Sequence, residues 1–227
     1  MKKFNHVTIE KLKFDLESDT TEKGRYYKTP EGLLYPSVTT VLSEYSKDGI
    51  LKWKQKIGEE KANKIASMAA NRGTMLHSVC EKYLLNEMSS LKMQTMMPTT
   101  KSLFMKLKPR IDESLDNIHS IEQALYSNNL KVAGRVDCIA EWDGVLSVID
   151  FKTSTKSKKE EYIQNYFMQC TTYTEMYEEL TGTPINQIVV VIAVEDDLSQ
   201  IFVKDKKPYL EKTVNFINNY HLTRLTT

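Results

Sequence analysis

Cysteine and long apolar runs are scarce in this chain of 227 residues, and each scarcity excludes a class of protein. The three cysteines, Cys80, Cys138 and Cys170, lie far apart and form no Cys-x-x-Cys pair. Such a set argues against a disulfide framework and against a zinc or iron–sulfur site, and it predicts buried thiols in a reducing compartment. No run approaches a membrane span, and the charged N-terminus lacks a signal-peptide core. We therefore expect a cytoplasmic protein with no membrane partner.

An excess of charge of either sign is also absent. The 31 lysines and arginines oppose 30 aspartates and glutamates and leave a net charge of +1. A protein that coats nucleic acid through charge alone is far more basic. Any nucleic-acid contact must therefore come from a local patch or channel.

The first half of the chain is predicted to hold short strands followed by helices. Strands at residues 25–28 and 33–35 flank a Thr-Pro-Glu-Gly turn, and Ser37 is suited to cap the helix that follows. Apolar residues then recur at helical spacing to about residue 115. A stretch rich in methionine, serine and threonine at residues 88–100 interrupts this pattern, and we expect it to be a mobile loop.

The second half alternates strands and helices. Predicted helices cover residues 160–181 and begin again at Pro208, and predicted strands cover residues 120–126, 134–142, 145–151, 186–194 and 201–203. We therefore predict one α/β domain in three parts. These are N-terminal strands in residues 1–36, a helical region in residues 37–118, and a core of mixed sheet flanked by helices in residues 119–227.

The residues that indicate chemistry lie on a predicted hairpin. Asp137 closes the motif Gly-Arg-Val-Asp on one strand, and Asp150 precedes Lys152 by two positions on the next, which puts these two on one face. Mg²⁺ takes carboxylate oxygens, and a lysine can orient or deprotonate water and stabilise charge on a phosphate. A simple ion pair is the usual interpretation of Asp-x-Lys. The second carboxylate, in otherwise apolar strands, favours phosphodiester hydrolysis at a metal site.

This pattern resembles the PD-(D/E)XK nuclease superfamily, and the flanking motifs resemble its RecB-type branch. Arg-Gly-Thr-Met-Leu-His at residues 72–77 and Gln-Cys-Thr-Thr-Tyr at residues 169–173 match two motifs of that branch. Residues 35–42 and 134–154 are similar to the mitochondrial genome maintenance exonucleases and their phage relatives. The resemblance implies a restriction-endonuclease-like fold with an N-terminal helical insertion. It also implies a DNA exonuclease that uses Mg²⁺ or Mn²⁺ and carries no iron–sulfur cluster.

The resemblance assigns a role to each matching residue. The catalytic residues are Asp137, Asp150 and Lys152, and the metal ligands are His77, Asp137, Asp150 and the carbonyl of Phe151. The residues expected to contact DNA are Arg72, Thr153, Gln169 and Tyr173, and Lys156 joins them because its charge follows directly after the catalytic strand.

Several of these residues also have an ordinary structural interpretation. His77 alone is a histidine on a helix flank, Arg72 a surface arginine, and Gln169 with Tyr173 a polar–aromatic helix edge. Glu122 is interpreted more readily as a solvated strand glutamate than as a support of the metal site. A further set of polar residues is either solvated or close to the site: Glu81, Lys156, Lys158 and Lys159.

The expected partner is single-stranded DNA, and proteins of replication, repair or recombination are further candidate partners. A phage in a bacterial host is a candidate source of the protein. The helical region between Ser37 and Leu115 is expected to bridge the site, so that a strand threading beneath it would favour cleavage from ends. Two alternatives stay open. One is a structure-specific endonuclease with the same metal site, and the other is a non-catalytic DNA-binding protein that retains the fold.

Overall fold

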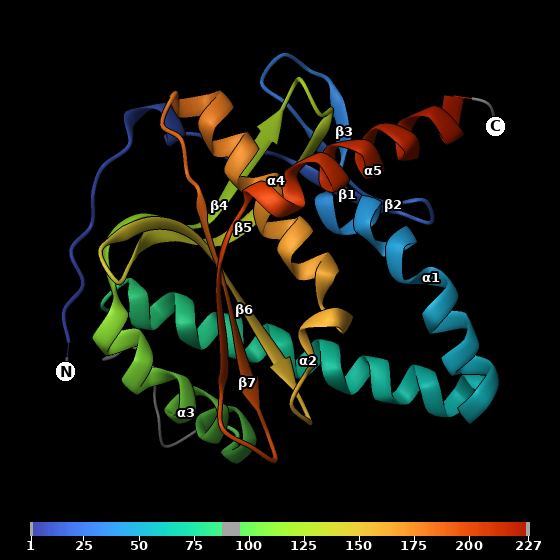
Figure 1. Ribbon diagram of the computed structural model, residues 1–227, viewed down its shortest axis with the longest axis horizontal. Helices are drawn as coiled ribbons and strands as arrows, with labels where there is room; N and C mark the ends of the chain where they lie inside the picture. Colours follow the sequence, from blue (N-terminus) through green and yellow to red (C-terminus); the bar gives the residue numbers. More distant parts are fainter. Residues whose placement is uncertain (1, 88–95, 226–227) are drawn as a thin grey trace.

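The computed structural model describes residues 2–87 and 96–225. These residues form a small three-stranded sheet, a five-stranded sheet and five α-helices (Figure 1). The small sheet is antiparallel in the order β1–β2–β3, with bounds Ser18–Thr21, Gly24–Lys28 and Leu34–Pro36. The two strands predicted around the Thr-Pro-Glu-Gly turn are therefore confirmed, and Gly32 takes the positive φ of 84° that this turn requires.

The five-stranded sheet runs in the order β4–β5–β6–β7–β8. Only the β6–β7 pair is parallel, so the sheet is mixed, as predicted. The strand bounds are Leu115–Ser127, Val132–Trp142, Val145–Ser154, Gln187–Val194 and Gln200–Asp205. The helical pattern predicted to about residue 115 ends with α3 at Ser114, and strand β4 begins at Leu115, five residues before the strand predicted at residues 120–126.

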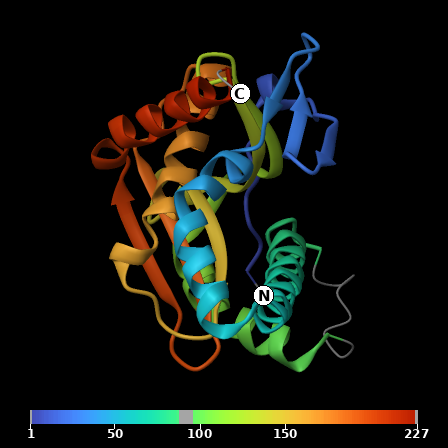
Figure 2. The same ribbon diagram turned by 90° about the vertical axis from the view of Figure 1, so that its right-hand side faces the viewer.

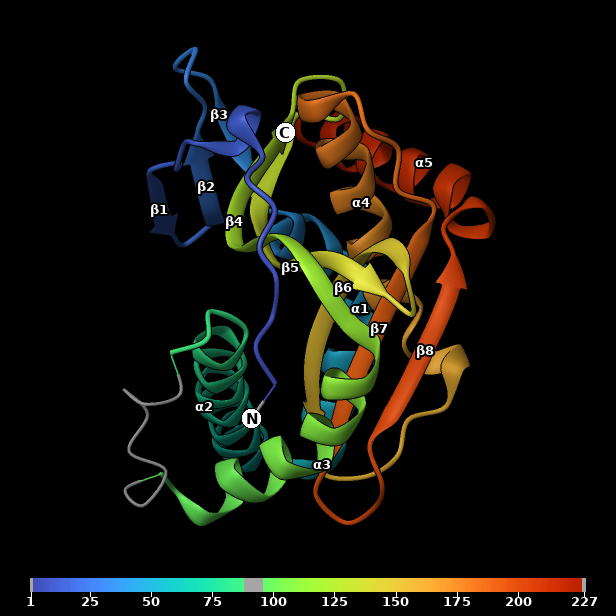
Figure 3. The same ribbon diagram turned by 90° about the vertical axis from the view of Figure 1, so that its left-hand side faces the viewer.

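Helices cover both faces of this sheet. Figures 2 and 3 show α4 (Gln164–Thr181) and α5 (Lys207–Leu225) on one face, and α2 (Glu59–Leu84) and α3 (Pro98–Ser114) on the other. Strand β7 joins the two cores, because its even-numbered residues pack with α4 and its odd-numbered residues pack with α2 and α3. The prediction of a strand buried on both faces is confirmed.

Local signals explain most helix ends. Ser37 caps α1 (Val38–Ile57) by accepting the backbone N–H of Thr40 at 3.0 Å. Gly182 ends α4 in the left-handed conformation. The loop predicted at residues 88–100 can be compared with the structure only in part. Residues 88–95 lie outside the described residues, whereas Pro98 begins α3 as a good first helical residue, so the loop prediction was wrong from there on.

The predicted helix at residues 160–181 is interrupted at its start. Residues Glu160–Tyr162 form a single 3-10 turn, and α4 begins at Gln164. Within the part of the chain that the structure describes, no helix combines the length and the apolar character needed to cross a bilayer.

Candidate active site

The ladder between β5 and β6 ends where the predicted carboxylates stand. Its last pair is Cys138 with Ile149. One residue further, Oδ2 of Asp137 accepts the backbone N–H of Phe151 at 2.8 Å. The carboxylate therefore takes the place of a strand carbonyl, and the two strands diverge around it.

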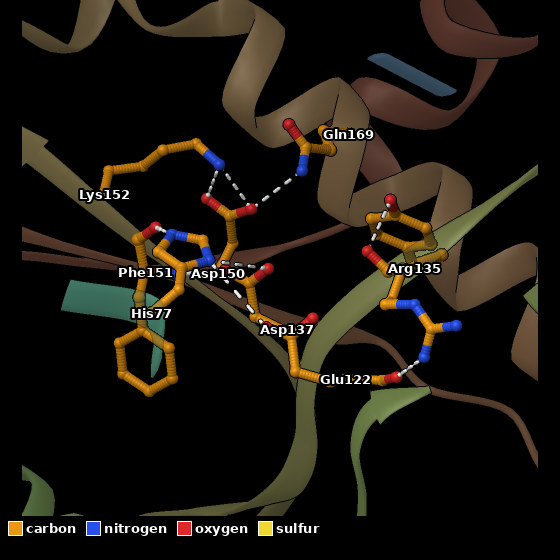
Figure 4. A network of polar contacts seen from close by, with 9 residues as sticks. His77, Glu122, Arg135, Asp137, Asp150, Phe151, Lys152 and Gln169 are labelled. Carbon is orange, nitrogen blue, oxygen red and sulfur yellow. Dashed lines mark hydrogen bonds and ion pairs between the residues drawn. The ribbon is translucent and has the colours of Figure 1, made fainter. Parts of the chain in front are cut away.

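A second cluster is formed by Asp150, Lys152 and Gln169 (Figure 4). Asp150 is 2% exposed, and Nζ of Lys152 lies 2.6 Å from each of its carboxylate oxygens. Gln169, from α4, donates from Nε2 to Oδ1 of Asp150 at 2.8 Å. Oδ2 of Asp150 is buried and has no hydrogen bond of good geometry within the described residues. The ion pair with Lys152 is what holds this oxygen.

The environment shifts the protonation of this pair. Burial raises the pKa of Asp150 to about 6 and Asp137 adds to the rise, while the Lys152 ammonium opposes it. Burial disfavours the charge on Lys152, but Asp150 and Asp137 outweigh it and hold the lysine pKa above its ordinary value. Lys152 is therefore an ammonium at neutral pH. In this arrangement it is suited to stabilise phosphate charge and not to act as a base.

His77 approaches from α2, on the other side of Asp137. Its Nε2 lies 2.5 Å from the carbonyl oxygen of Phe151. Because a carbonyl only accepts, Nε2 carries a hydrogen, and Nδ1 is the ring nitrogen that faces the carboxylates. Nδ1 lies 3.5 Å from Oδ1 of Asp137 and 3.9 Å from Oε1 of Glu122.

Glu122 belongs to this site, although the sequence favoured a solvated position. Its carboxylate is 28% exposed and lies beside His77 and Asp137 (Figure 4). Burial and the charge of Asp137 raise the pKa of Glu122 to about 7. Donor atoms of His77, Glu122 and Asp137 all lie within 4.8 Å of one another, and this set of one imidazole and two carboxylates fits a divalent cation. The sequence placed Glu122 on a strand next to the metal motif but did not show which residue it faces. The register that sets it opposite Asp137 is visible only once the strands are paired.

The residues predicted to contact DNA divide into two groups. Gln169 and Tyr173 face the protein interior. Tyr173 is 3% exposed, and its hydroxyl donates to the carbonyl of Arg135 at 2.9 Å, which ties β5 to α4. Arg72 forms an ion pair with Glu195 at 2.8 Å, and its side chain is 16% exposed.

Among the residues predicted to contact DNA, Arg72 and Gln169 are half-buried and Lys156 is exposed. Thr153 is half-buried on β6, whereas Lys156, Lys158 and Lys159 are exposed in the loop that follows. These lysines are therefore the ones placed to meet a ligand from solvent.

Known proteins resemble this chain in sequence. The family model of the PD-(D/E)XK nuclease superfamily matches residues 50–215. Mitochondrial genome maintenance exonuclease 1 of Homo sapiens is 31% identical over 140 residues, which are 58% of this chain and 40% of that protein. The protein of the same name from Xenopus tropicalis is 27% identical over 169 residues, 71% of this chain and 47% of that protein. The matched segments thus span less than half the length of these relatives.

A solved structure from Eubacterium rectale superimposes with a TM-score of 0.46 and 12% identity, over 64% of this chain and 63% of that chain, a likeness too loose to carry an argument. The family match covers most of the chain, and the mixed sheet flanked by helices is the restriction-endonuclease-like fold that the motifs implied. This chain belongs to the PD-(D/E)XK nuclease superfamily.

Proposed function

We propose that this nuclease is a Mg²⁺- or Mn²⁺-dependent deoxyribonuclease that hydrolyses phosphodiester bonds from the ends of single-stranded DNA. The observation that carries the proposal is the convergence of His77, Asp137, Asp150 and Lys152 where β5 and β6 diverge. Among the related proteins, two are named exonucleases, which supports action on ends. Roles in replication, repair or recombination follow from the same resemblance.

Each residue of the site has a distinct task in this proposal. His77 and Asp137 would hold the cation. Asp150 and the Phe151 carbonyl, which the sequence analysis also names as metal ligands, would complete the set. When bound, the cation would polarise the phosphoryl oxygen and acidify a water. The Lys152 ammonium donates to phosphate oxygens and so stabilises the charge that develops during cleavage.

The DNA strand would be held by local charge, because the net charge of the chain is only +1. The exposed lysines after β6, Lys156 and Lys158, are suited to attract phosphates close to the site. We propose that Gln169 and Tyr173 support the site from beneath by orienting Asp150 and β5. The predicted passage of the strand beneath the helical region belongs to this proposal too.

Metal dependence is tested by chelation. EDTA should abolish cleavage of end-labelled DNA, and excess Mg²⁺ or Mn²⁺ should restore it. Asp150→Asn and Lys152→Ala should each lower the cleavage rate by at least about a hundredfold. Lys207→Ala, which removes an exposed lysine of α5, is the matched control and should cleave like the wild type. Wild-type rates in the Asp150 and Lys152 variants would instead favour a non-catalytic DNA-binding protein.

Action on ends is tested with two substrates of one sequence. A linear single strand should be degraded, whereas the same strand closed into a circle should resist. Efficient cleavage of circles would reject obligatory entry at an end and would favour a structure-specific endonuclease. A time course on 5′- and 3′-labelled single- and double-stranded DNA reports polarity and strand preference in the same experiment.

A further inference from the structure

The metal site holds a carboxylate that the sequence motifs do not include. We propose that Glu122 is a direct ligand of the divalent cation, together with Asp137 and Nδ1 of His77. This inference rests on the metal dependence proposed above and names the residues that supply it. Four features of the structure support it: the orientation of the His77 ring, the register of β4 with β5, the backbone conformation of Glu122, and the contacts that already engage Asp150.

The tautomer of His77 directs its free nitrogen toward Glu122. Nε2 donates to the Phe151 carbonyl at 2.5 Å, so Nδ1 is the nitrogen that a neutral ring would offer to a cation. Histidines that bind metals usually donate their other ring N–H to a carbonyl or carboxylate, which fixes the ring in place. The Phe151 carbonyl serves this purpose here. The carboxylates that face Nδ1 are those of Asp137 and Glu122, at 3.5 and 3.9 Å.

The register of β4 and β5 brings the two carboxylates together. Ile121 pairs with Cys138 and Gln123 pairs with Val136, which places Glu122 opposite Asp137. Like charges directly opposite one another destabilise a sheet unless something neutralises them. Within the described residues, neither carboxylate has a lysine or arginine at ion-pair distance, and Nδ1 of His77 lies 3.5 Å from Asp137 and 3.9 Å from Glu122. A divalent cation would supply the missing positive charge.

The backbone at Glu122 is held in an unusual conformation by a neighbour. Its φ is +47°, a region that residues other than glycine rarely adopt. The Arg135 guanidinium donates to the carbonyl of Glu122 and to the carboxylate of Asp15. Arg135 thus binds the main chain of Glu122 and leaves its carboxylate directed at His77, as Figure 4 shows. Arg135 is therefore a positioning residue for Glu122.

Asp150 is already engaged by other groups. Lys152 lies 2.6 Å from both of its oxygens, and Gln169 donates to one of them. The cluster of metal-ligand atoms within 4.8 Å of one another contains Glu122 and not Asp150. A cation seated at Nδ1 of His77 therefore meets the carboxylate of Glu122 before it displaces Lys152 from Asp150.

The test is a titration of the intact, metal-free protein with Mn²⁺. The electron paramagnetic resonance signal of the aquo ion measures the concentration of unbound Mn²⁺ at each step. Glu122→Gln keeps the shape of the side chain and removes its charge. Glu81→Gln is the matched control, because Glu81 lies on α2 close enough to act on the pKa of Glu122 but is outside the ligand cluster. Circular dichroism melts would check that both variants fold.

Loss of a ligand should weaken Mn²⁺ binding by roughly a hundredfold in Glu122→Gln, whereas loss of a nearby charge should cost less than about tenfold in Glu81→Gln. Excess Mn²⁺ should also recover part of the cleavage activity of Glu122→Gln. Equal affinities of the two variants would overturn the role of Glu122 and leave the proposed function intact. A wild-type protein that binds no Mn²⁺ would instead remove the proposed function and this inference together.

Discussion

Replacing Gly134 by alanine should disturb the site from beneath without touching any of its charged groups. A Cβ at this position would lie 2.8 Å from the hydroxyl oxygen of Tyr173 and 3.0 Å from its Cε1. The tyrosine cannot move aside freely, because it is 3% exposed and lies in the core between the sheet and α4. Its hydroxyl also holds the Arg135 carbonyl, two residues before Asp137.

The expected cost follows from these contacts. Forcing an extra methyl group into a packed core costs about 1–3 kcal/mol, and losing the Tyr173–Arg135 hydrogen bond adds about 1 kcal/mol. We therefore expect Gly134→Ala to lower the free energy of unfolding by about 2–4 kcal/mol in urea denaturation. Cleavage should fall as well, because β5 carries Asp137.

A double-mutant cycle isolates the contact. Tyr173→Phe removes the oxygen nearest to the added methyl group and should cost about 1 kcal/mol alone. Combined with Gly134→Ala, it should cost less than the sum of the two, because both changes break one hydrogen bond. Gly49→Ala is the control, because nothing lies within 4 Å of a Cβ there and alanine is the better helix former. An unfolding free energy of Gly134→Ala within about 0.5 kcal/mol of the wild type, or strict additivity, would refute this account.

Three further predictions concern the surroundings of the site and the fold. Arg135→Lys should weaken Mn²⁺ binding, because Arg135 positions Glu122. Asp15→Asn, which removes the charge of the other partner of Arg135, should leave Mn²⁺ binding unchanged, and equal Mn²⁺ affinities of the two variants would contradict this. Burial lowers the pKa of His119, so the contribution of His119 to stability should be complete above pH about 6.5 and be lost as the pH falls below it, because the unfolded chain then binds the proton more readily; His119→Leu should remove this part of the slope of urea midpoint against pH. Ser37→Ala should cost about 1 kcal/mol of unfolding free energy, because it removes the cap of α1, and an unchanged urea midpoint would contradict that role.

Much of the fold and the centre of the site could be predicted because their signals are local. The Asp143-Gly144 hairpin turn has positive φ at both residues, and Gly182 ends α4 as expected. The placement of Asp150 and Lys152 on one strand face follows from two-residue periodicity alone, and their contact at 2.6 Å agrees with it. Two starts were misplaced: α3 begins at Pro98, where a loop was predicted, and β4 begins five residues before the predicted strand.

The amino-acid sequence by itself determined which groups were present for chemistry: two aspartates, a lysine and a histidine in motif spacing. Tertiary structure decided which of them meet. It placed Glu122 opposite Asp137 by strand register and brought His77 to a carbonyl 74 residues away. It also turned Tyr173 inward onto Gly134. Periodicity specifies the face of an element on which a side chain lies, but not the element that packs against that face. Contacts between distant elements therefore became visible only once the sheet was assembled.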